Sequence, residues 1–303
     1  MKSFLNKVNR KIVNKVKNVG LIIWSRNKKY NISVIDNYES LKLISNNQLS
    51  VIRFGDGELD LIRGCNIPYQ NYDSVLANKM KDLILKKSPS NVLICLPDVF
   101  QSINRYNKKC RYFYYEEFFY QNRKFLKEIE NTKNKYGSTF ISRPYIDLKD
   151  KSNSGKYFEK LKSLWQGKNL LIVEGKYTRS GEGNDLFSNA NSISRIIVPS
   201  KNAFIKRKKI EQAICKYAGD KLILLMVGPT AKIIISDLKI DANFPNQMID
   251  IGHVDSEYEW FKMGAKEKVK IPHKHTAEFN TDDYKVTLLD DQSYLNEVKE
   301  IIN

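Results

Sequence analysis

The feature that most restricts the fold of this 303-residue chain is a series of short, nearly continuous apolar runs, each ending at a polar, glycine or proline residue. Runs without apolar–polar alternation are typical of strands buried on both faces of a sheet. Helical candidates lie between them, at residues 112–136, 157–165, 201–217 and 230–238. We therefore predict an α/β fold in which helices flank a largely parallel sheet. The predicted strands are residues 51–54, 92–96, 138–142, 169–173, 193–198, 221–227 and 248–251.

The composition is that of a folded protein in a reducing compartment. With 42% hydrophobic and 11% aromatic residues, the chain is too apolar for general disorder. No linker, repeat or low-complexity tract interrupts residues 36–303, which we predict to be one domain. The four cysteines are scattered without a Cys-x-x-Cys pair, which argues against zinc ligation and against a disulfide framework. We therefore expect a cytoplasmic protein.

A basic N-terminal arm, residues 1–35, carries about half of the net charge of +17, because nine Lys or Arg residues precede the first acid, Asp36. Its apolar residues recur at three- and four-residue steps and end at Trp24, which predicts an amphipathic helix. The apolar end is too short to span a bilayer. We predict that the arm lies on the anionic inner face of the cytoplasmic membrane. The alternative is a helix that packs on the domain or on a partner.

The segment Asp56-Gly57-Glu58 follows the first predicted strand directly and places two carboxylates beside glycines. On an extended backbone, residues two apart project from the same side, so both acids would reach one cation. Such hard oxygen ligands suit Mg²⁺ or Mn²⁺ shared with substrate phosphates. The alternative interpretation is the N-terminus of a helix, where the helix dipole favours acids.

Polar residues also follow several later strands, and in parallel sheets ligands bind beyond the carboxyl ends of the strands. Gly228-Pro229-Thr230 opens a helix after the run 221–227, a geometry that exposes backbone N–H groups to a phosphate. In the alternative, Thr230 is simply the N-cap and Gly228 makes the turn.

A polar, glycine-rich loop covers residues 174–187 and lacks both the Walker A and the Gly-x-Gly-x-x-Gly patterns. We predict that Lys176 and Arg179 neutralise a diphosphate and that Asn184 and Asp185 bind hydroxyl groups. A solvated connecting loop is the alternative.

The segment 252–261 holds a Ser-x-x-Glu capping box, Ser256 with Glu259, at the start of a predicted helix. Capping leaves His253, Asp255 and Glu257 unexplained, and these are our candidate catalytic residues, as base, metal ligand or hydroxyl binder. A strand-end histidine can equally be structural. His273 and His275 share a strand face but have no third ligand for zinc in view.

Taken together, three of these segments resemble the GT-D-fold glycosyltransferases of bacteria, over roughly residues 36–280. The matching stretches, which occur in the family's order, are 53–58, then 181–187 with 195–197, and then 228–231 with 249–261.

The resemblance implies a Rossmann-like domain that uses a UDP-sugar and a divalent cation, Mn²⁺ or Mg²⁺, with Asp56 and Glu58 as its DxE metal pair. It also implies transfer of a hexose to a glycan or lipid-linked oligosaccharide acceptor, in the synthesis of bacterial surface polysaccharide or glycoprotein. The predicted nucleotide-sugar ligands are Arg53, Gly55, Asp56, Lys176, Arg179, Asn184, Asp185, Gly228, Pro229 and Thr230.

Two alternative functions remain open at this point. The first is a non-enzymatic nucleic-acid-binding protein, suggested by the charge of +17 and the 17 tyrosines. No nucleic-acid-binding signature occurs, and the charge gathers in an arm rather than among aromatic residues, so we predict no nucleic-acid partner. The second is another Rossmann-type phosphate-handling enzyme, such as a phosphotransferase.

Overall fold

The computed structural model describes residues 20, 23, 25, 28–276, 279 and 286–303. Most of the predicted arm, namely residues 1–27 except 20, 23 and 25, lies outside the described residues, so its amphipathic helix and its membrane contact stay predictions. In the described part of the chain, no helix is both long enough and apolar enough to cross a bilayer.

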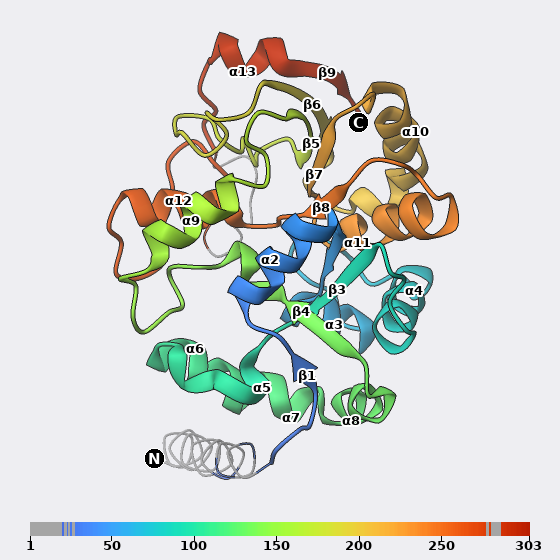
Figure 1. Ribbon diagram of the computed structural model, residues 1–303, viewed down its shortest axis with the longest axis vertical. Coiled ribbons are helices and arrows are strands. Elements are labelled where there is room, and N and C mark those ends of the chain that lie inside the picture. The colour runs from blue at the N-terminus through green and yellow to red at the C-terminus, as the bar shows by residue number, and fades with distance from the viewer. Residues whose placement is uncertain (1–19, 21–22, 24, 26–27, 277–278, 280–285) are drawn as a thin grey trace, which may run out of the picture.

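A nine-stranded sheet forms the centre of the molecule, in the order β1-β4-β3-β2-β8-β7-β5-β6-β9 (Figure 1). Every neighbouring pair of strands is parallel, as the apolar runs predicted. The strands are β1 Ser33–Val34, β2 Ser50–Arg53, β3 Val92–Leu96, β4 Lys135–Ser138, β5 Asn169–Gly175, β6 Ser192–Val198, β7 Leu222–Met226, β8 Met248–Asp250 and β9 Val298–Ile301.

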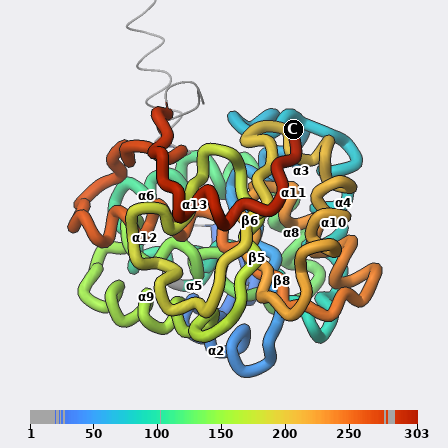
Figure 2. Tube along the Cα trace, turned by 90° about the horizontal axis from the view of Figure 1, so that it is seen from above, coloured from blue at the N-terminus to red at the C-terminus, as the bar shows by residue number. Residues whose placement is uncertain are grey.

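Helices cover both faces of the sheet (Figure 1). One face carries α4 Ser74–Leu85, α8 Arg123–Thr132, α10 Arg207–Tyr217 and α11 Thr230–Ile235, and the other carries α2 Asn37–Asn47, α9 Ser154–Lys162 and α12 Val254–Lys262. The helix α13, Gln292–Glu297, contacts β6 and β9, and Figure 2 shows it beside β6. The remaining helices are α3 Asp56–Ile62, α5 Val99–Ser102, α6 Lys108–Phe113 and α7 Phe119–Gln121.

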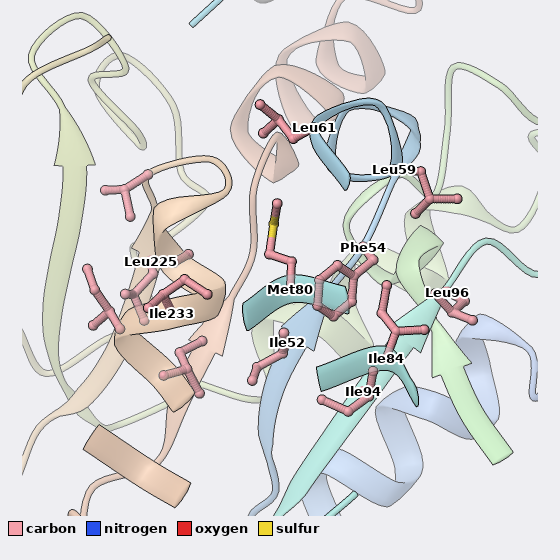
Figure 3. Packing of buried hydrophobic residues seen from close by; sticks show 14 of the residues in the cluster. Ile52, Phe54, Leu59, Leu61, Met80, Ile84, Ile94, Leu96, Leu225 and Ile233 are labelled. Atoms are coloured by element: carbon pink, nitrogen blue, oxygen red, sulfur yellow. The ribbon is translucent and has the colours of Figure 1, made fainter. Parts of the chain in front are cut away.

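Two apolar cores, one on each face, hold these layers together. Figure 3 shows part of the first, where Ile52 and Phe54 at the end of β2 meet Met80 and Ile84 of α4. All four side chains are wholly buried, and each such burial stabilises the fold by about 1.5–3 kcal/mol relative to exposure. This packing fixes the direction in which the chain leaves β2, and so fixes the start of α3.

Most predicted strands are confirmed, but the segment 138–142 is not a strand. The strand β4 ends at Ser138, and Thr139–Ser142 forms a 3₁₀ turn instead. The cause is local, because the Ser138 hydroxyl accepts a hydrogen bond from the Phe140 N–H and closes the turn. The predicted helix 112–136 is also wrong in its bounds: the structure has α6, a π-helical turn, α7 and α8 over 108–132, separated at Asn122.

The order of the strands places a crevice at the carboxyl ends of β2 and β8. From β2 the chain proceeds to β3 and then β4 on one side, whereas β8, β7 and β5 lie on the other. A change of direction of this kind leaves an opening between the connections that follow the two strands, where open α/β sheets bind ligands.

Candidate active site

A cavity of about 540 Å³ occupies this crevice. Segments that follow β2, β5, β7 and β8 line it, together with α6 and the turn after β4. Of the predicted site residues, the cavity wall includes Arg53, Gly55, Asp56, Glu58, Gly228, Pro229, His253 and Asp255, and it does not include Lys176, Arg179, Asn184, Asp185, Thr230 or Glu257.

The two acids of the Asp56-Gly57-Glu58 segment lie in the first turn of α3, so the predicted extended backbone at this point is wrong. Gly55 is the N-cap, and its N–H donates to Glu58 Oε2 at 2.8 Å. The two side chains therefore leave the helix in different directions.

Asp56 and Glu58 differ sharply in their surroundings. Asp56 is exposed to the cavity, and its carboxylate makes no hydrogen bond or salt bridge to another described residue. The cavity walls displace bulk water around it, and this desolvation raises its pKa, while Arg143 acts in the opposite direction. Glu58 is buried, and its Oε1 lies 2.8 Å from the ammonium of Lys232.

Lys232 joins Glu58 to a second buried ion pair. Its Nζ lies 2.9 Å from Asp250 Oδ2, while Arg53 Nη2 lies 3.0 Å from Asp250 Oδ1. Burial alone would raise the pKa of Asp250, but the two cations hold it below its ordinary value. We call these four residues, Arg53, Glu58, Lys232 and Asp250, the charge network.

Arg53 lines the cavity but binds protein groups. Besides Asp250 Oδ1, it donates to the carbonyl oxygens of Asp250 and Thr139 and to Ser142 Oγ. The guanidinium also leaves no room at Gly252, where a Cβ would lie 1.9 Å from Arg53 Nη2. Arg53 therefore holds together β2, β8 and the 3₁₀ turn after β4, beneath the cavity.

A divalent cation fits this wall only if the substrate supplies some of its ligands. No group of three His, Cys, Asp or Glu residues in the described part of the chain has the geometry of a metal site. Asp56 offers a carboxylate that no other described residue pairs with, and each oxygen of Glu58 has a lone pair left after its one contact with the part of the chain that the structure describes. Mg²⁺ and related ions are commonly held by one or two carboxylates plus phosphate oxygens and water. The donor set thus suits a cation shared with a diphosphate.

The turn Gly228-Pro229 reaches the cavity, but Thr230 does not. The helix α11 begins at Thr230 after Pro229, so Thr230 is not the N-cap, and it is wholly buried. Gly228 has φ +55°, and a Cβ there would lie 3.0 Å from the ring of Tyr69.

Tyr69 lines the cavity and was missed in the sequence. Its carbonyl oxygen accepts from the Asn202 N–H at 2.9 Å, and the Asn71 N–H donates to Asn202 Oδ1 at 2.7 Å. These bonds connect the loop after α3 to the loop after β6 at one end of the cavity. The sequence gives no signal for this connection, because the bonded residues lie far apart along the chain. Asn71 and Asn202 are 131 positions apart.

The loop 174–187 is not a solvated connection, and the four residues predicted to bind the diphosphate and hydroxyl groups lie outside the cavity wall. Arg179 is buried, forms a bidentate salt bridge with Glu182, and stacks on the Tyr294 ring at 3.9 Å. Asn184 Nδ2 donates to Asp255 Oδ1 at 2.9 Å and to Glu259 Oε1 at 2.7 Å. These side chains are turned toward protein partners, which explains their absence from the cavity wall.

The other two polar residues predicted in this loop also lie outside the cavity. Lys176 is exposed, with its ammonium 5.5 Å from the centre of the Tyr177 ring. Burial would raise the pKa of Asp185, but hydrogen bonds from Lys262, Tyr258 and Lys162 hold it at about 2. From this loop Gly175, Tyr177 and Thr178 reach the cavity instead.

The predicted capping box Ser256–Glu259 is wrong, because the N-cap of α12 is His253, three residues before Ser256, and the helix begins at Val254. Glu259 pairs instead with Lys274 at 2.8 Å. The residue His253 lines the cavity and is partly exposed.

The two acids of this segment serve different neighbours. Asp255 borders the cavity, accepts from the Gly181 N–H at 2.7 Å, and lies 3.0 Å from Lys274 Nζ. Glu257 is wholly buried and accepts from the N–H groups of Tyr145 and Ile146 at 3.1 and 3.0 Å. Burial, opposed in part by Arg143, raises the pKa of Glu257 to about 7.

Charged and aromatic side chains that the sequence analysis did not assign to the site complete the cavity wall. Lys232 is the one charged residue in an otherwise apolar helix start, and Asp250 and Arg53 are charged residues inside apolar strands. Charges in such apolar segments indicate that these residues form ion pairs with one another. Arg143, which lies 3.0 Å from Asp147, carried no such signal. The missed wall residues are Tyr69, Lys109, Phe113, Tyr114, Arg143, Tyr177, Lys232, Asp250, Lys268 and His275.

Comparison with known sequences gives a consistent set of relatives. The sequence model of the family described as "Glycosyltransferase GT-D fold" matches residues 51–279. The probable glycosyl transferase Gly of Streptococcus gordonii is 48% identical over 267 residues, which are 88% of this chain and 38% of that protein. Glycosyltransferase GlyD of Streptococcus pneumoniae is 47% identical over 260 residues, which are 86% of this chain and 31% of that protein. The chain therefore spans about a third of the length of these curated relatives.

Solved structures agree. One, described as a new glycosyltransferase from Streptococcus sanguinis, has a TM-score of 0.84 and 46% identity, over 90% of this chain and 100% of that one. Another, described as showing that the highly conserved domain of unknown function 1792 has a distinct glycosyltransferase fold, has a TM-score of 0.82 and 48% identity, over 94% of this chain and 99% of that one. These similarities confirm the predicted fold class.

Proposed function

This chain belongs to the GT-D-fold glycosyltransferases, and from that premise we propose that it transfers a hexosyl group from a UDP-sugar with the help of Mn²⁺ or Mg²⁺. The proposed acceptor is a glycan or lipid-linked oligosaccharide used for bacterial surface polysaccharide or glycoprotein. Family membership confirms the predicted enzyme class and favours it over a nucleic-acid-binding protein and over other phosphate-handling enzymes.

The observation that carries the proposal is the carboxylate of Asp56, which is exposed to a cavity of about 540 Å³ and has no partner among the described residues, while the charges beneath it are paired. A cavity of this size is within the usual range for small-molecule and cofactor sites. An exposed acid at the carboxyl end of a central parallel strand is placed where such sheets bind nucleotides.

Glycosyl transfer requires that the negative charge of the leaving diphosphate be neutralised as the bond to the sugar breaks. A divalent cation held by Asp56 and Glu58 would supply that Lewis-acid stabilisation. The chain itself contributes Arg143 and Lys268 on the cavity wall, and the Gly228-Pro229 turn faces the same space. Tyr69 and Tyr177 add flat apolar surfaces suited to a base or a sugar ring.

The acceptor hydroxyl must lose a proton during transfer, and among the three predicted candidates we propose His253 for this role. His253 borders the cavity and is partly exposed, so a hydroxyl can reach it. Asp255 also borders the cavity, but Lys274 and the Gly181 N–H already hold its carboxylate. Glu257 lies behind the wall, and we propose that it acts only by fixing the backbone at Tyr145 and Ile146. Single replacements of His253 should lower transfer more than UDP affinity.

The proposal extends to location, because a lipid-linked acceptor lies at the cytoplasmic face of the membrane. Nine positive charges in the arm would each contribute on the order of 1 kcal/mol near an anionic leaflet, before screening and geometry reduce the sum. The full-length chain should then sediment with anionic but not neutral vesicles, and deletion of residues 1–30 should release it. Equal sedimentation of the truncated chain would remove the arm from this role.

A screen of UDP-sugars tests the function directly. UDP release should be measured with Mn²⁺ for the glucose, galactose, N-acetylglucosamine and N-acetylgalactosamine donors. We expect one or two donors to turn over, with complete loss in excess EDTA and recovery when Mn²⁺ is restored. No release from any of the four donors, together with turnover of a nucleoside triphosphate, would overturn the proposal in favour of a phosphotransferase.

A further inference from the structure

Lys232 occupies an unusual place for a lysine. Its residue is only 3% exposed, although it borders the cavity, and its neighbours on α11 are the wholly buried Ala231 and Ile233. An ammonium taken out of water is costly unless it is paired and hydrogen-bonded. Three oxygens surround this one: Glu58 Oε1 at 2.8 Å, Asp250 Oδ2 at 2.9 Å and the Gly228 carbonyl at 3.1 Å.

The charge network is balanced as it stands. Arg53 and Lys232 carry two positive charges, and Glu58 and Asp250 carry two negative charges, with all four residues at most 8% exposed. The Lys232 ammonium is the only one of the two cations that contacts Glu58. A divalent cation that approached Glu58 would meet this ammonium within a few ångströms, where repulsion between like charges is strong in a partly desolvated site.

We propose that Lys232 is a positioning residue that makes cation binding depend on the nucleotide. By neutralising Glu58, it leaves Asp56 as the one carboxylate of the DxE pair that forms no ion pair with a described residue, and one such carboxylate is too little to hold a hydrated divalent ion tightly. The diphosphate of the donor brings further negative oxygens, and these offset the repulsion from the ammonium. This inference rests on the proposed function, because it assumes that Asp56 and Glu58 face a cation and a nucleoside diphosphate.

The test is a titration of Mn²⁺, followed by the electron paramagnetic resonance signal of the free ion, with and without UDP. The wild-type chain should bind Mn²⁺ weakly alone and at least tenfold more tightly with saturating UDP. In Lys232→Met, Mn²⁺ should bind without UDP about tenfold or more tightly than in the wild type, because removal of one positive charge frees the carboxylates of Glu58 and Asp250. The dependence on UDP should shrink accordingly. Lys232→Arg keeps the charge and should behave as the wild type.

Lys239 provides a matched control on the same helical segment. It is also a buried lysine, but its ammonium donates to the carbonyl oxygens of Phe244 and Pro245, away from the acids. Lys239→Met should leave Mn²⁺ affinity unchanged. A merely structural role for Lys232 would lower Mn²⁺ affinity in Lys232→Met, which is the opposite direction from the proposal.

Two results would overturn the inference. One is wild-type affinity for Mn²⁺ that is the same with and without UDP, a measurement that needs no variant and so holds even if Lys232→Met does not fold. The other is a folded Lys232→Met that binds Mn²⁺ no more tightly than the wild type. Failure of the proposed function looks different: Mn²⁺ and UDP would bind cooperatively as described, but no UDP-sugar would turn over.

Discussion

Two polar segments follow strands of the same sheet, and they use their charges in different ways. At the start of α3, Asp56 presents a carboxylate to the cavity while Glu58 beneath it is paired. In the loop 174–187, Arg179, Asn184 and Asp185 all turn to protein partners, and none borders the cavity. A polar residue at a strand end is therefore a stronger candidate ligand when the fold leaves it unpaired than when several protein groups already hold it.

If an unpaired carboxylate marks the ligand site, replacement of Asp56 should have the largest effect on binding and turnover. Asp56→Asn removes the charge that faces the cavity, so Mn²⁺-dependent UDP binding should be lost and turnover should fall at least a thousandfold, about 4 kcal/mol in the activation barrier. The melting temperature should stay close to that of the wild type. Calorimetric titration of UDP in the presence of Mn²⁺ measures the first effect.

Asp60 is the matched control, because it also borders the cavity but forms a salt bridge with Arg63, the C-cap of α3. Asp60→Asn should change turnover by less than about tenfold, since its charge is already compensated. If Asp56→Asn and Asp60→Asn lose turnover equally, the salt bridge of Asp60 does not explain the different roles of the two acids.

Arg179 should show the reverse pattern, with a large effect on stability and little on binding. Arg179→Met leaves buried Glu182 without its cation and removes the stacking on Tyr294, which should lower the free energy of unfolding by about 3 kcal/mol. UDP affinity of the folded fraction should be unchanged. Urea unfolding and UDP titration measure the two quantities, and Lys176→Met, an exposed change in the same loop, should alter neither. If Arg179→Met instead binds UDP more weakly and keeps its full stability, Arg179 is a ligand of the donor.

Glu257 is a buried acid whose hydrogen bonds are to the protein, so its effect should appear in the pH dependence of stability rather than in UDP binding. Its pKa is raised to about 7, so the folded state binds a proton that the unfolded state releases near the ordinary glutamate value. Stability from this group is therefore present at low pH and is lost as the pH rises toward and through 7. Between pH 5 and 8 the loss should be about 2.5 kcal/mol.

Glu257→Gln should flatten that pH dependence while UDP affinity stays near the wild-type value. Chemical unfolding at several pH values measures the first, and the variant should gain on the wild type as the pH rises. A variant whose unfolding free energy still falls by the full amount would place the titrating group elsewhere.

The sequence predicted the sheet well and the site only in part, for different physical reasons. The runs at 92–96 and 169–173 became β3 and the first part of β5, because burial on both faces leaves a continuous apolar signal. β1 and β9 have two and four residues and no such run, so they were missed. Whether a charge has a partner depends on residues far along the chain: Tyr294 lies 115 positions after Arg179, and no spacing rule connects them. The charge network was easier to predict, because Arg53 and Asp250 are charged residues in apolar strands, and such residues are expected to pair.

The smallest expected effect is on stability, at Gly252, where contact with Arg53 of the charge network can be distinguished from strain in the backbone. Gly252 and Gly64 both have positive φ, +43° and +90°, so any side chain at either position strains the backbone. A Cβ at Gly64 would meet nothing within 4 Å, whereas one at Gly252 would lie 1.9 Å from Arg53 Nη2. Because Arg53 is held by Asp250, it cannot yield without breaking a buried salt bridge. Gly252→Ala should therefore lower the free energy of unfolding by about 2 kcal/mol more than Gly64→Ala. Urea unfolding of both variants measures the difference, and equal losses would show that Arg53 can move freely, so that its position beneath the cavity is not fixed by the network.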